Sequence, residues 1–112
     1  MNLGDVQVSL EGPVVIADLN GEIDLSNADG IEQAIVTATP NHAETVLLDL
    51  SDVEYLDSAG IHLVYRLREA LHSRGQTLKL VMGADSPAAD ALRLAGVMDH
   101  LEIERTIEAA LE

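Results

Sequence analysis

The sequence predicts an α/β fold in which helices alternate with the strands of a mixed sheet. Short runs of alternating or uninterrupted aliphatic residues indicate strands, and segments with an apolar residue every three to four positions indicate helices between them. Together these patterns give the order β-β-α-β-α-β-α-β-α. Strands joined through a helix lie parallel and a direct hairpin is antiparallel, so we expect an antiparallel opening and a parallel remainder.

Length and composition are those of one domain spanning residues 1–112. With 47% hydrophobic residues, the chain is long enough to bury a single core. The absence of cysteine excludes disulfides and thiolate metal sites and fits a reducing cytoplasm. No stretch approaches the ~18 to 20 apolar residues of a membrane span, and residues 1–12 lack the pattern of a secretion signal. We therefore expect a cytoplasmic protein without membrane insertion.

The charge of the chain is strongly negative and unevenly distributed. There are 20 acidic residues against 6 Lys and Arg, which gives a net charge of −14. The first basic residue is Arg66, so that residues 1–65 hold 12 acids and no Lys or Arg. Such a surface repels nucleic-acid phosphates and anionic lipids, and it attracts a basic protein partner. Solubility alone is the other explanation of this charge.

The first 40 residues predict a hairpin followed by a helix. Residues 6–10 alternate in polarity, a glycine-containing turn follows, and residues 13–19 continue as a second strand. Helical spacing then extends from a cap at Ser26 or Asn27 to a stop at Pro40. The apolar face of this helix consists of Ile31, Ala34, Ile35 and Ala38.

The middle of the chain predicts a buried strand and the longest helix. Residues 45–50 are nearly all apolar, as in a central strand covered on both faces. The helix spans residues 58–74, with Asp57 as its cap and Gly75 as its stop. At 100° per residue, its sheet-facing side consists of Gly60, Leu63, Val64, Leu67, Ala70 and Leu71. Its solvent side consists of Ser58, His62, Arg66, Glu69, His72 and Ser73.

Two larger apolar groups also fall on the solvent side of this helix. Tyr65 lies near its middle and Ile61 at its edge. Exposed tyrosine is a common anchor of protein interfaces, so a partner is one occupant to expect there. A loop or the terminal helix of the chain itself is the other.

The last third of the chain predicts two strands and two short helices. Residues 76–82 form a strand, and Ser86-Pro87 is a strong start for a helix that ends at Gly96. Residues 101–103 form the last strand, before a short helix capped by Thr106.

Ser58, at the start of the longest helix, admits three roles: nucleophile, helix cap and modification site. A nucleophile needs a base such as His62, a third group that orients this base, and an oxyanion hole. The serine elbow of a hydrolase reads G-x-S-x-G, but Leu56 occupies the position of its first glycine. Phosphate-binding and calcium-binding loops are absent, as are histidines at metal-ligand spacing. We therefore predict no catalytic residue, no metal and no cofactor.

The two other roles of Ser58 remain open on spacing alone. Serine is a preferred capping residue. A phosphate on its hydroxyl would be partly accommodated by the backbone N–H groups at the helix start. It would also add about −1.5 to −2 charges beside Asp52, Glu54 and Asp57 and so change the surface offered to a partner.

Four segments occur in the order found in a known family: GEID (21–24) after the second strand, LLDLSDVEYLDSAGIHLV (47–64), RGQTLKLV (74–81) and SPAADALRLAGVMDHLEI (86–103). They resemble the STAS domain family, and within it the stand-alone anti-sigma factor antagonists of bacterial stress and sporulation pathways. The resemblance spans nearly the whole chain. It implies an α/β, STAS-like mixed sheet of four to five strands with helices packed mainly on one face, and a binding protein that is not an enzyme.

In these antagonists the serine at the position of Ser58 is phosphorylated by the anti-sigma factor, which is a serine kinase, and a phosphatase reverses this. The unmodified form binds the anti-sigma factor and frees the sigma factor. The resemblance thus implies Ser58 as the phosphoacceptor and a partner-binding face of Gly21, Glu22, Asp24, Asp57 and Gly60. We add Ile61, His62 and Tyr65 to this face because of their place on the solvent side.

Two residues depart from the family pattern. Ala59 stands where a second Ser or Thr is common, and His62 where a small residue is usual. Because helical side chains lean toward the amino end, His62 is expected to reach over Ser58 and contact a phosphate or obstruct docking. The main alternative function is a STAS subunit or regulator of a lipid or anion transporter or a sensory complex, acting without a kinase. A small hydrolase using Ser58 and His62 is the remaining alternative.

Overall fold

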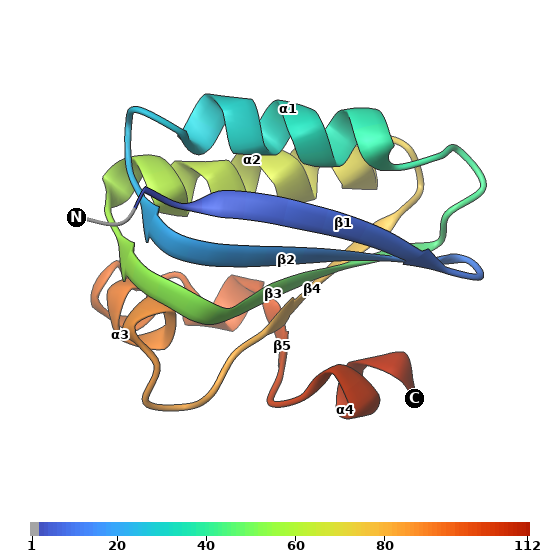
Figure 1. The fold of residues 1–112 in the computed structure, drawn as a ribbon. Helices are drawn as coiled ribbons and strands as arrows, with labels where there is room; N and C mark the ends of the chain where they lie inside the picture. Colours follow the sequence, from blue (N-terminus) through green and yellow to red (C-terminus); the bar gives the residue numbers. More distant parts are fainter. Residues whose placement is uncertain (1–2) are drawn as a thin grey trace.

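A computed structural model of the protein describes residues 3–112, which form five strands and four α-helices. The strands are β1 (Asp5–Glu11), β2 (Val14–Ile23), β3 (Thr45–Leu56), β4 (Thr77–Val81) and β5 (Glu102–Glu104). The helices are α1 (Ala28–Ala38), α2 (Ser58–His72), α3 (Pro87–Leu94) and α4 (Ile107–Leu111). The sheet order is β1-β2-β3-β4-β5, with β1 antiparallel to β2 and the other pairs parallel (Figure 1). The predicted fold class is confirmed.

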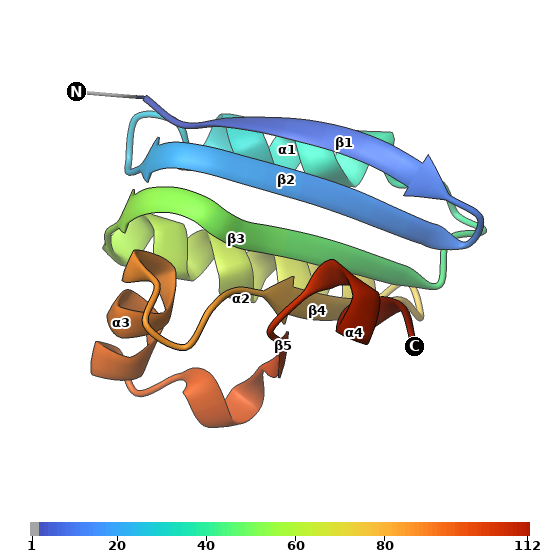
Figure 2. The same ribbon diagram turned by 60° about the horizontal axis from the view of Figure 1, so that its bottom comes forward.

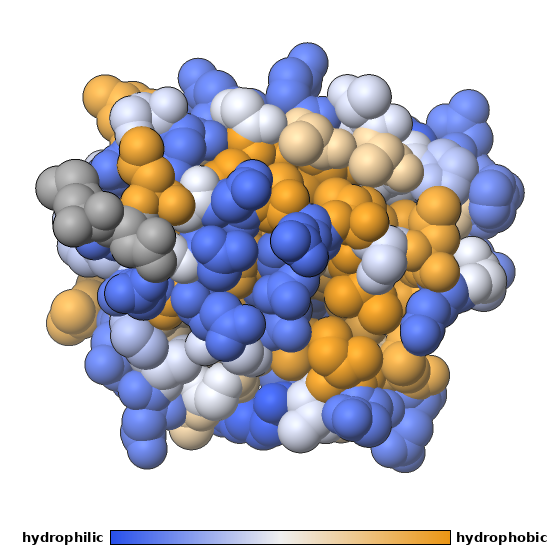
Figure 3. Space-filling view, viewed as in Figure 1, coloured by the Kyte–Doolittle hydropathy of each residue, from blue (hydrophilic) through white to orange (hydrophobic). Residues whose placement is uncertain are grey.

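Helices lie on both faces of this sheet, but unequally. The long helices α1 and α2 cover one face, and the short α4 lies on the other (Figures 1 and 2). Helix α3 packs against β3, and its buried residues belong to the same hydrophobic cluster as those of α1 and α2. Hydrophobic surface remains between α1 and α4 toward the β1–β2 hairpin (Figure 3). The helices therefore pack mainly on one face, as expected.

Strand β3 lies at the centre of the sheet and is buried on both faces. Val46, Leu48 and Leu50 point into the cluster under α1 and α2. Leu47 points the other way and packs against Val81 and Ala110, the latter from α4. Because the chain has no Phe or Trp, this core is filled by aliphatic side chains.

Helix α2 turns the predicted side toward the sheet. Four large side chains and one glycine of this helix are buried: Gly60, Leu63, Val64, Leu67 and Leu71. Ala70, which we expected among them, is only half-buried. On the exposed side, Arg66 donates hydrogen bonds of 2.8 Å to Glu32 and Asp29 of α1. The bond to Glu32, more than that to Asp29, raises the pKa of Arg66 above its ordinary value.

Strands β2 and β3 are longer than the sequence predicted. We expected them to end at residues 19 and 50, but they continue to Ile23 and Leu56, which pair with each other. The register shifts between Asp18 and Asn20 and again after Gly21. Gly21 has a φ of 72°, a conformation that glycine adopts without strain. GEID therefore does not follow the second strand, because its first three residues are the end of that strand.

Of the four α-helices in residues 3–112, three begin with the predicted capping side chain. The side chains of Asp57, Ser86 and Thr106 accept backbone N–H groups at the starts of α2, α3 and α4. Asn27 precedes α1 but makes no side-chain cap bond. A 3₁₀ turn at Met98–His100 was not predicted. Helix α2 ends at His72, two residues earlier than expected, and the last strand lies one residue later than expected.

Asp18 lies on the sheet face opposite α1 and α2, between Ala17 and Leu19, which point into the core. Its Oδ1 is buried and has no hydrogen-bond partner among the described residues. Burial, followed by the negative charges of Asp49 and Asp52, raises the pKa of this carboxyl. The folded state then holds its proton to a higher pH than the unfolded state, so stability falls as the pH rises between the two pKa values. Neutral pH lies above the ordinary pKa of aspartate, so Asp18 destabilises the fold there.

Asp18→Asn removes a partly buried charge that faces Asp49 on the paired strand, so it is expected to raise the free energy of unfolding at neutral pH by about 0.2 to 1 kcal/mol, the size of a typical cross-strand pair interaction. Thermal unfolding followed by circular dichroism measures it. The gain should disappear once the pH is below the ordinary pKa of aspartate, because the carboxyl is then neutral in both states. Asp85→Asn, at an exposed loop position, makes the same change in net charge and serves as control. A lower melting temperature of Asp18→Asn at neutral pH would contradict this account.

Candidate functional site

Two loops meet at the edge of the sheet where β2 and β3 end. Ile23 pairs with Leu56, and the N–H of Asp57 donates to the carbonyl of Ile23 at 3.3 Å. Asp24 and Asp57 therefore begin neighbouring loops, and α2 starts directly afterwards. Figure 1 shows this edge at the left, where the loop before α1 passes close to the start of α2. Of the residues predicted from sequence, it gathers Gly21, Glu22, Asp24, Asp57, Ser58 and Gly60.

Ser58 is exposed, and it is the first residue of α2 rather than its cap. Asp57 is the cap: its Oδ1 accepts the N–H of Ala59 at 2.9 Å and that of Gly60 at 3.2 Å. No hydrogen bond within residues 3–112 involves the Ser58 hydroxyl. Of the three roles considered for Ser58, capping is thus excluded.

The loop between β2 and α1 is held in place by side-chain hydrogen bonds. Asn27 Oδ1 accepts the N–H of Asp24 at 2.9 Å, while its Nδ2 donates to the carbonyls of Glu22 at 2.9 Å and Gly4 at 3.3 Å. The Ser26 hydroxyl and N–H both donate to Asp24, which lowers the pKa of that carboxyl. Asp24 therefore presents a fixed negative charge beside the start of α2.

Gly60 lies where α2 passes closest to the end of β3. A Cβ at this position would come within 2.4 Å of Leu56 Cδ1, 2.8 Å of Leu56 Cγ and 3.4 Å of Ile23 Cγ2. A separation under about 3 Å is a severe overlap for two carbon atoms. The missing side chain thus allows α2 to begin directly against the paired ends of β2 and β3.

The three residues added to the face from the helical pattern are placed differently. Ile61 is half-buried and packs against the main core, so it is not an exposed apolar group. Tyr65 is also half-buried, but α4 does not cover it, since this helix lies on the opposite face of the sheet. His62 is exposed. Among the described residues it makes no hydrogen bond with Ser58, so the histidine considered as a base is not bonded to that hydroxyl.

Three apolar side chains at this edge are exposed although the sequence did not predict it. Leu25, next to Asp24, is 83% exposed. Leu3 and Tyr55 are 59% and 51% exposed. Both are backbone partners of Glu22 in the sheet, Leu3 on one side and Tyr55 on the other. The inward position of Leu56 signals that Tyr55 points outward, because successive side chains of a strand alternate. Leu3 and Leu25 gave no comparable signal.

The described residues show neither a cluster of metal ligands nor a helix able to span a membrane. Among residues 3–112, no group of three or more His, Asp or Glu is arranged to hold a metal ion. None of the helices in this part of the chain has the length and apolar character needed to cross a bilayer.

Fold and edge together define an α/β module that presents a free serine among carboxylates and exposed apolar side chains. The chain belongs to the STAS domain family, whose model matches residues 5–110. It is 29% identical over 107 residues to the anti-sigma-F factor antagonist RsfB of Mycobacterium tuberculosis, covering 95% of this chain and 85% of RsfB.

Solved structures share the fold. An anti-sigma factor antagonist from Mycobacterium paratuberculosis matches with a TM-score of 0.80 and 25% identity, covering 97% of this chain and 92% of the other. The anti-sigma factor antagonist SpoIIAA in its unphosphorylated form matches with a TM-score of 0.76 and 20% identity over 96% and 93% of the chains. The phosphorylated form of SpoIIAA from Bacillus matches with a TM-score of 0.69 and 23% identity over 96% of each chain. The likeness to SpoIIAA shows the fold alone.

Proposed function

We propose that the chain is an anti-sigma factor antagonist that works by binding and is switched off by phosphorylation of Ser58. Its unmodified form binds an anti-sigma factor that is also a serine kinase, and this binding releases the sigma factor. The names of RsfB and of the Mycobacterium paratuberculosis protein support the antagonist role. The chain acts as a regulatory binding protein in the cytoplasm, not as an enzyme.

The observation that carries this proposal is the Ser58 hydroxyl, which has no structural task. It is exposed at the first residue of α2, and Asp57 already caps the helix. Transfer of the γ-phosphoryl group of ATP to Ser58 Oγ, with ADP as leaving group, would break no hydrogen bond of the described fold. That SpoIIAA has been solved both with and without phosphate supports a fold that tolerates either state.

The phosphate acts on the surface and not on the fold. We expected the start of α2 to accommodate it, but the N–H groups of Ala59 and Gly60 are already bonded to Asp57. The added charge of about −1.5 to −2 therefore stays at the edge, beside Asp57 and Asp24. Modification changes what a partner meets and leaves the packing beneath unchanged.

The partner-binding face extends from Ser58 across the ends of β2 and β3. Glu22, Asp24 and Asp57 supply negative charge, while Tyr55 and Leu25 supply exposed apolar area. Interfaces commonly combine apolar anchors with charges that orient the partner. A basic surface with apolar recesses on the anti-sigma factor would complement this face.

Incubation with the cognate anti-sigma factor kinase and ATP tests this function. We expect the protein to gain one phosphate by intact-mass spectrometry, and Ser58→Ala to gain none. Ser51→Ala is the matched control, because Ser51 is another exposed serine, on β3. It should be labelled like the unmodified sequence. Labelling of Ser58→Ala would overturn the assignment of the acceptor, and a kinase that binds the chain without labelling it would overturn the switch.

A further inference from the structure

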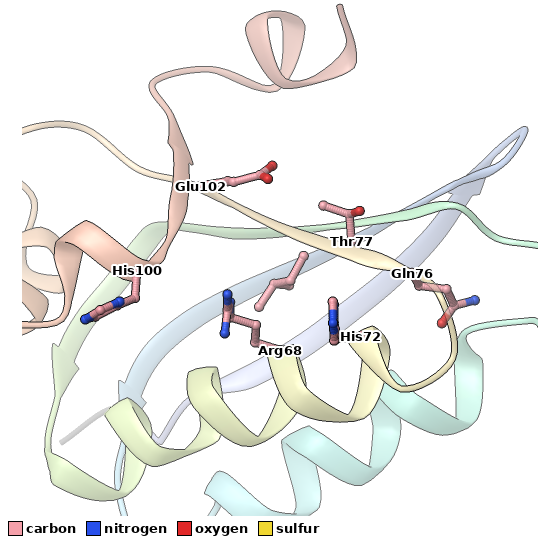
Figure 4. A pocket seen from close by; sticks show the side chains of 7 residues that line it. Arg68, His72, Gln76, Thr77, His100 and Glu102 are labelled. Carbon is pink, nitrogen blue, oxygen red and sulfur yellow. The ribbon is translucent and has the colours of Figure 1, made fainter.

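A polar cavity lies along the other end of α2, away from Ser58. Its volume is about 270 Å³, and its lining includes Arg68 and His72 of α2, Thr77 of β4, His100 of the 3₁₀ turn and Glu102 of β5. Figure 4 shows that Arg68 and His72 rise from the helix toward β4, with His100 at one end. Three side chains that donate hydrogen bonds to anions thus line one cavity of a very acidic chain.

Arg68 is the least engaged basic residue of this part of the chain. Within residues 3–112, the five other Lys and Arg side chains each donate a hydrogen bond to a protein oxygen. Arg68 donates none, and its ion pair with the adjacent Glu69 measures 3.7 Å between side chains that are 44% and 74% exposed. Its guanidinium, with five N–H donors in a fork that matches a carboxylate, is free to take a ligand.

Gln76 also lines this cavity, but its amide is buried and held in place. The residue is only 3% exposed, and its Nε2 donates to the carbonyls of Pro40 at 3.0 Å and Ala43 at 2.9 Å. These two bonds fix the amide, whose buried Oε1 has no partner among the described residues. A buried acceptor without a donor costs free energy. Because this oxygen has almost no exposed surface, Gln76 forms part of the cavity wall and is assigned no bond to a ligand.

We propose that this cavity binds a small organic carboxylate that also carries an amino or hydroxyl group, as amino acids and hydroxy acids do. The carboxylate pairs with Arg68 and accepts from the imidazole of His72, one turn further along α2. The amino or hydroxyl group donates to the carboxylate of Glu102. Glu102 balances the charge of Arg68, so the cavity favours a monoanion over a phosphate dianion. The volume suits a small metabolite, since typical ligand pockets begin near roughly 300 Å³.

Titration of the ¹⁵N-labelled protein with L-serine, acetate and inorganic phosphate, followed by NMR, tests the site. L-serine should give saturable shifts confined to residues around the cavity, with acetate and phosphate binding more weakly. Arg68→Gln should weaken L-serine binding by about tenfold or more, because it removes a charge-assisted hydrogen bond. Arg93→Gln is the matched control: it makes the same charge change on α3, where Arg93 pairs with Asp90. Its affinity should be unchanged.

Three results would overturn the proposal. Shifts that do not saturate, or that spread over all basic residues, would mean only nonspecific attraction of anions. Equal weakening by Arg68→Gln and Arg93→Gln would exclude a specific role of Arg68. Equal affinity for acetate and L-serine would show that the amino or hydroxyl group of the ligand makes no hydrogen bond in the cavity. None of these outcomes depends on phosphorylation of Ser58, so this inference and the proposed function are tested independently of each other.

Discussion

Ser58→Asp is expected to weaken binding of the anti-sigma factor by at least about tenfold, which corresponds to about 1.4 kcal/mol. A kinase that phosphorylates Ser58 must bring both the phosphates of its nucleotide and its catalytic carboxylate to this hydroxyl. A negative side chain at the same point then meets like charges in a partly desolvated interface, which is costly. Isothermal titration calorimetry with the ADP-bound kinase measures the change.

The controls separate charge from shape and position. Ser58→Asn has nearly the shape of aspartate without its charge, so it should retain most of the affinity. Ser51→Asp adds the same charge at an exposed position of β3 and tests for a general electrostatic effect. Unchanged affinity of Ser58→Asp, or an equal loss in Ser58→Asn, would contradict a charge-operated switch.

Gly60→Ala is expected to lower the free energy of unfolding by about 1 to 3 kcal/mol, the usual cost of overpacking a core. Alanine favours a helix over glycine by up to about 1 kcal/mol, so the overlap has to outweigh that gain. It does so because the new Cβ would lie 2.4 Å from Leu56 Cδ1 and 2.8 Å from Leu56 Cγ, and Leu56 is itself buried. Chemical denaturation followed by circular dichroism measures the loss.

A control and a double variant locate the cause of this loss. Gly83→Ala changes a glycine with an ordinary φ, where a new Cβ would have no heavy atom within 4 Å beyond its chain neighbours, so it should be near neutral. Leu56→Ala removes the side chain that the Cβ at position 60 would strike. Gly60→Ala combined with Leu56→Ala should therefore be less destabilised than the two single changes added together. Additive losses, or a stabilised Gly60→Ala, would show that the contact with Leu56 does not set the requirement for glycine.

Local patterns accounted for the elements and their order. Helix caps such as Asp57 and Ser86, and stops such as Gly75, act within a few residues of chain, so the sequence reveals them directly. The periodicity of α2 likewise identified the side that faces the sheet, because burial of an apolar stripe is the main reason for its pattern. The family resemblance added the expectation that Ser58 and Asp24 share one face, which local patterns do not contain.

What the sequence predicted least well depends on contacts between distant segments. Strands β2 and β3 extend past their apolar runs because each supplies the other's backbone partners, as the pairing of Ile23 with Leu56 shows. Ile61 lies on the predicted edge of a stripe, yet neighbouring elements bury it in part. Tyr55 was overlooked because its exposure follows from the continuation of β3.

By itself, the sequence determined an aliphatic α/β chain with its elements in order, an acidic first half, and a serine at the start of the longest helix. Each of these is a matter of composition or of neighbours along the chain. Only the tertiary structure decided that Asp24 lies beside the start of that helix, that Tyr55 and Leu25 are exposed at the same edge, and that Arg68 and His100 line one cavity. Backbone pairing and side-chain burial bring residues together across the sheet, and these depend on the whole fold.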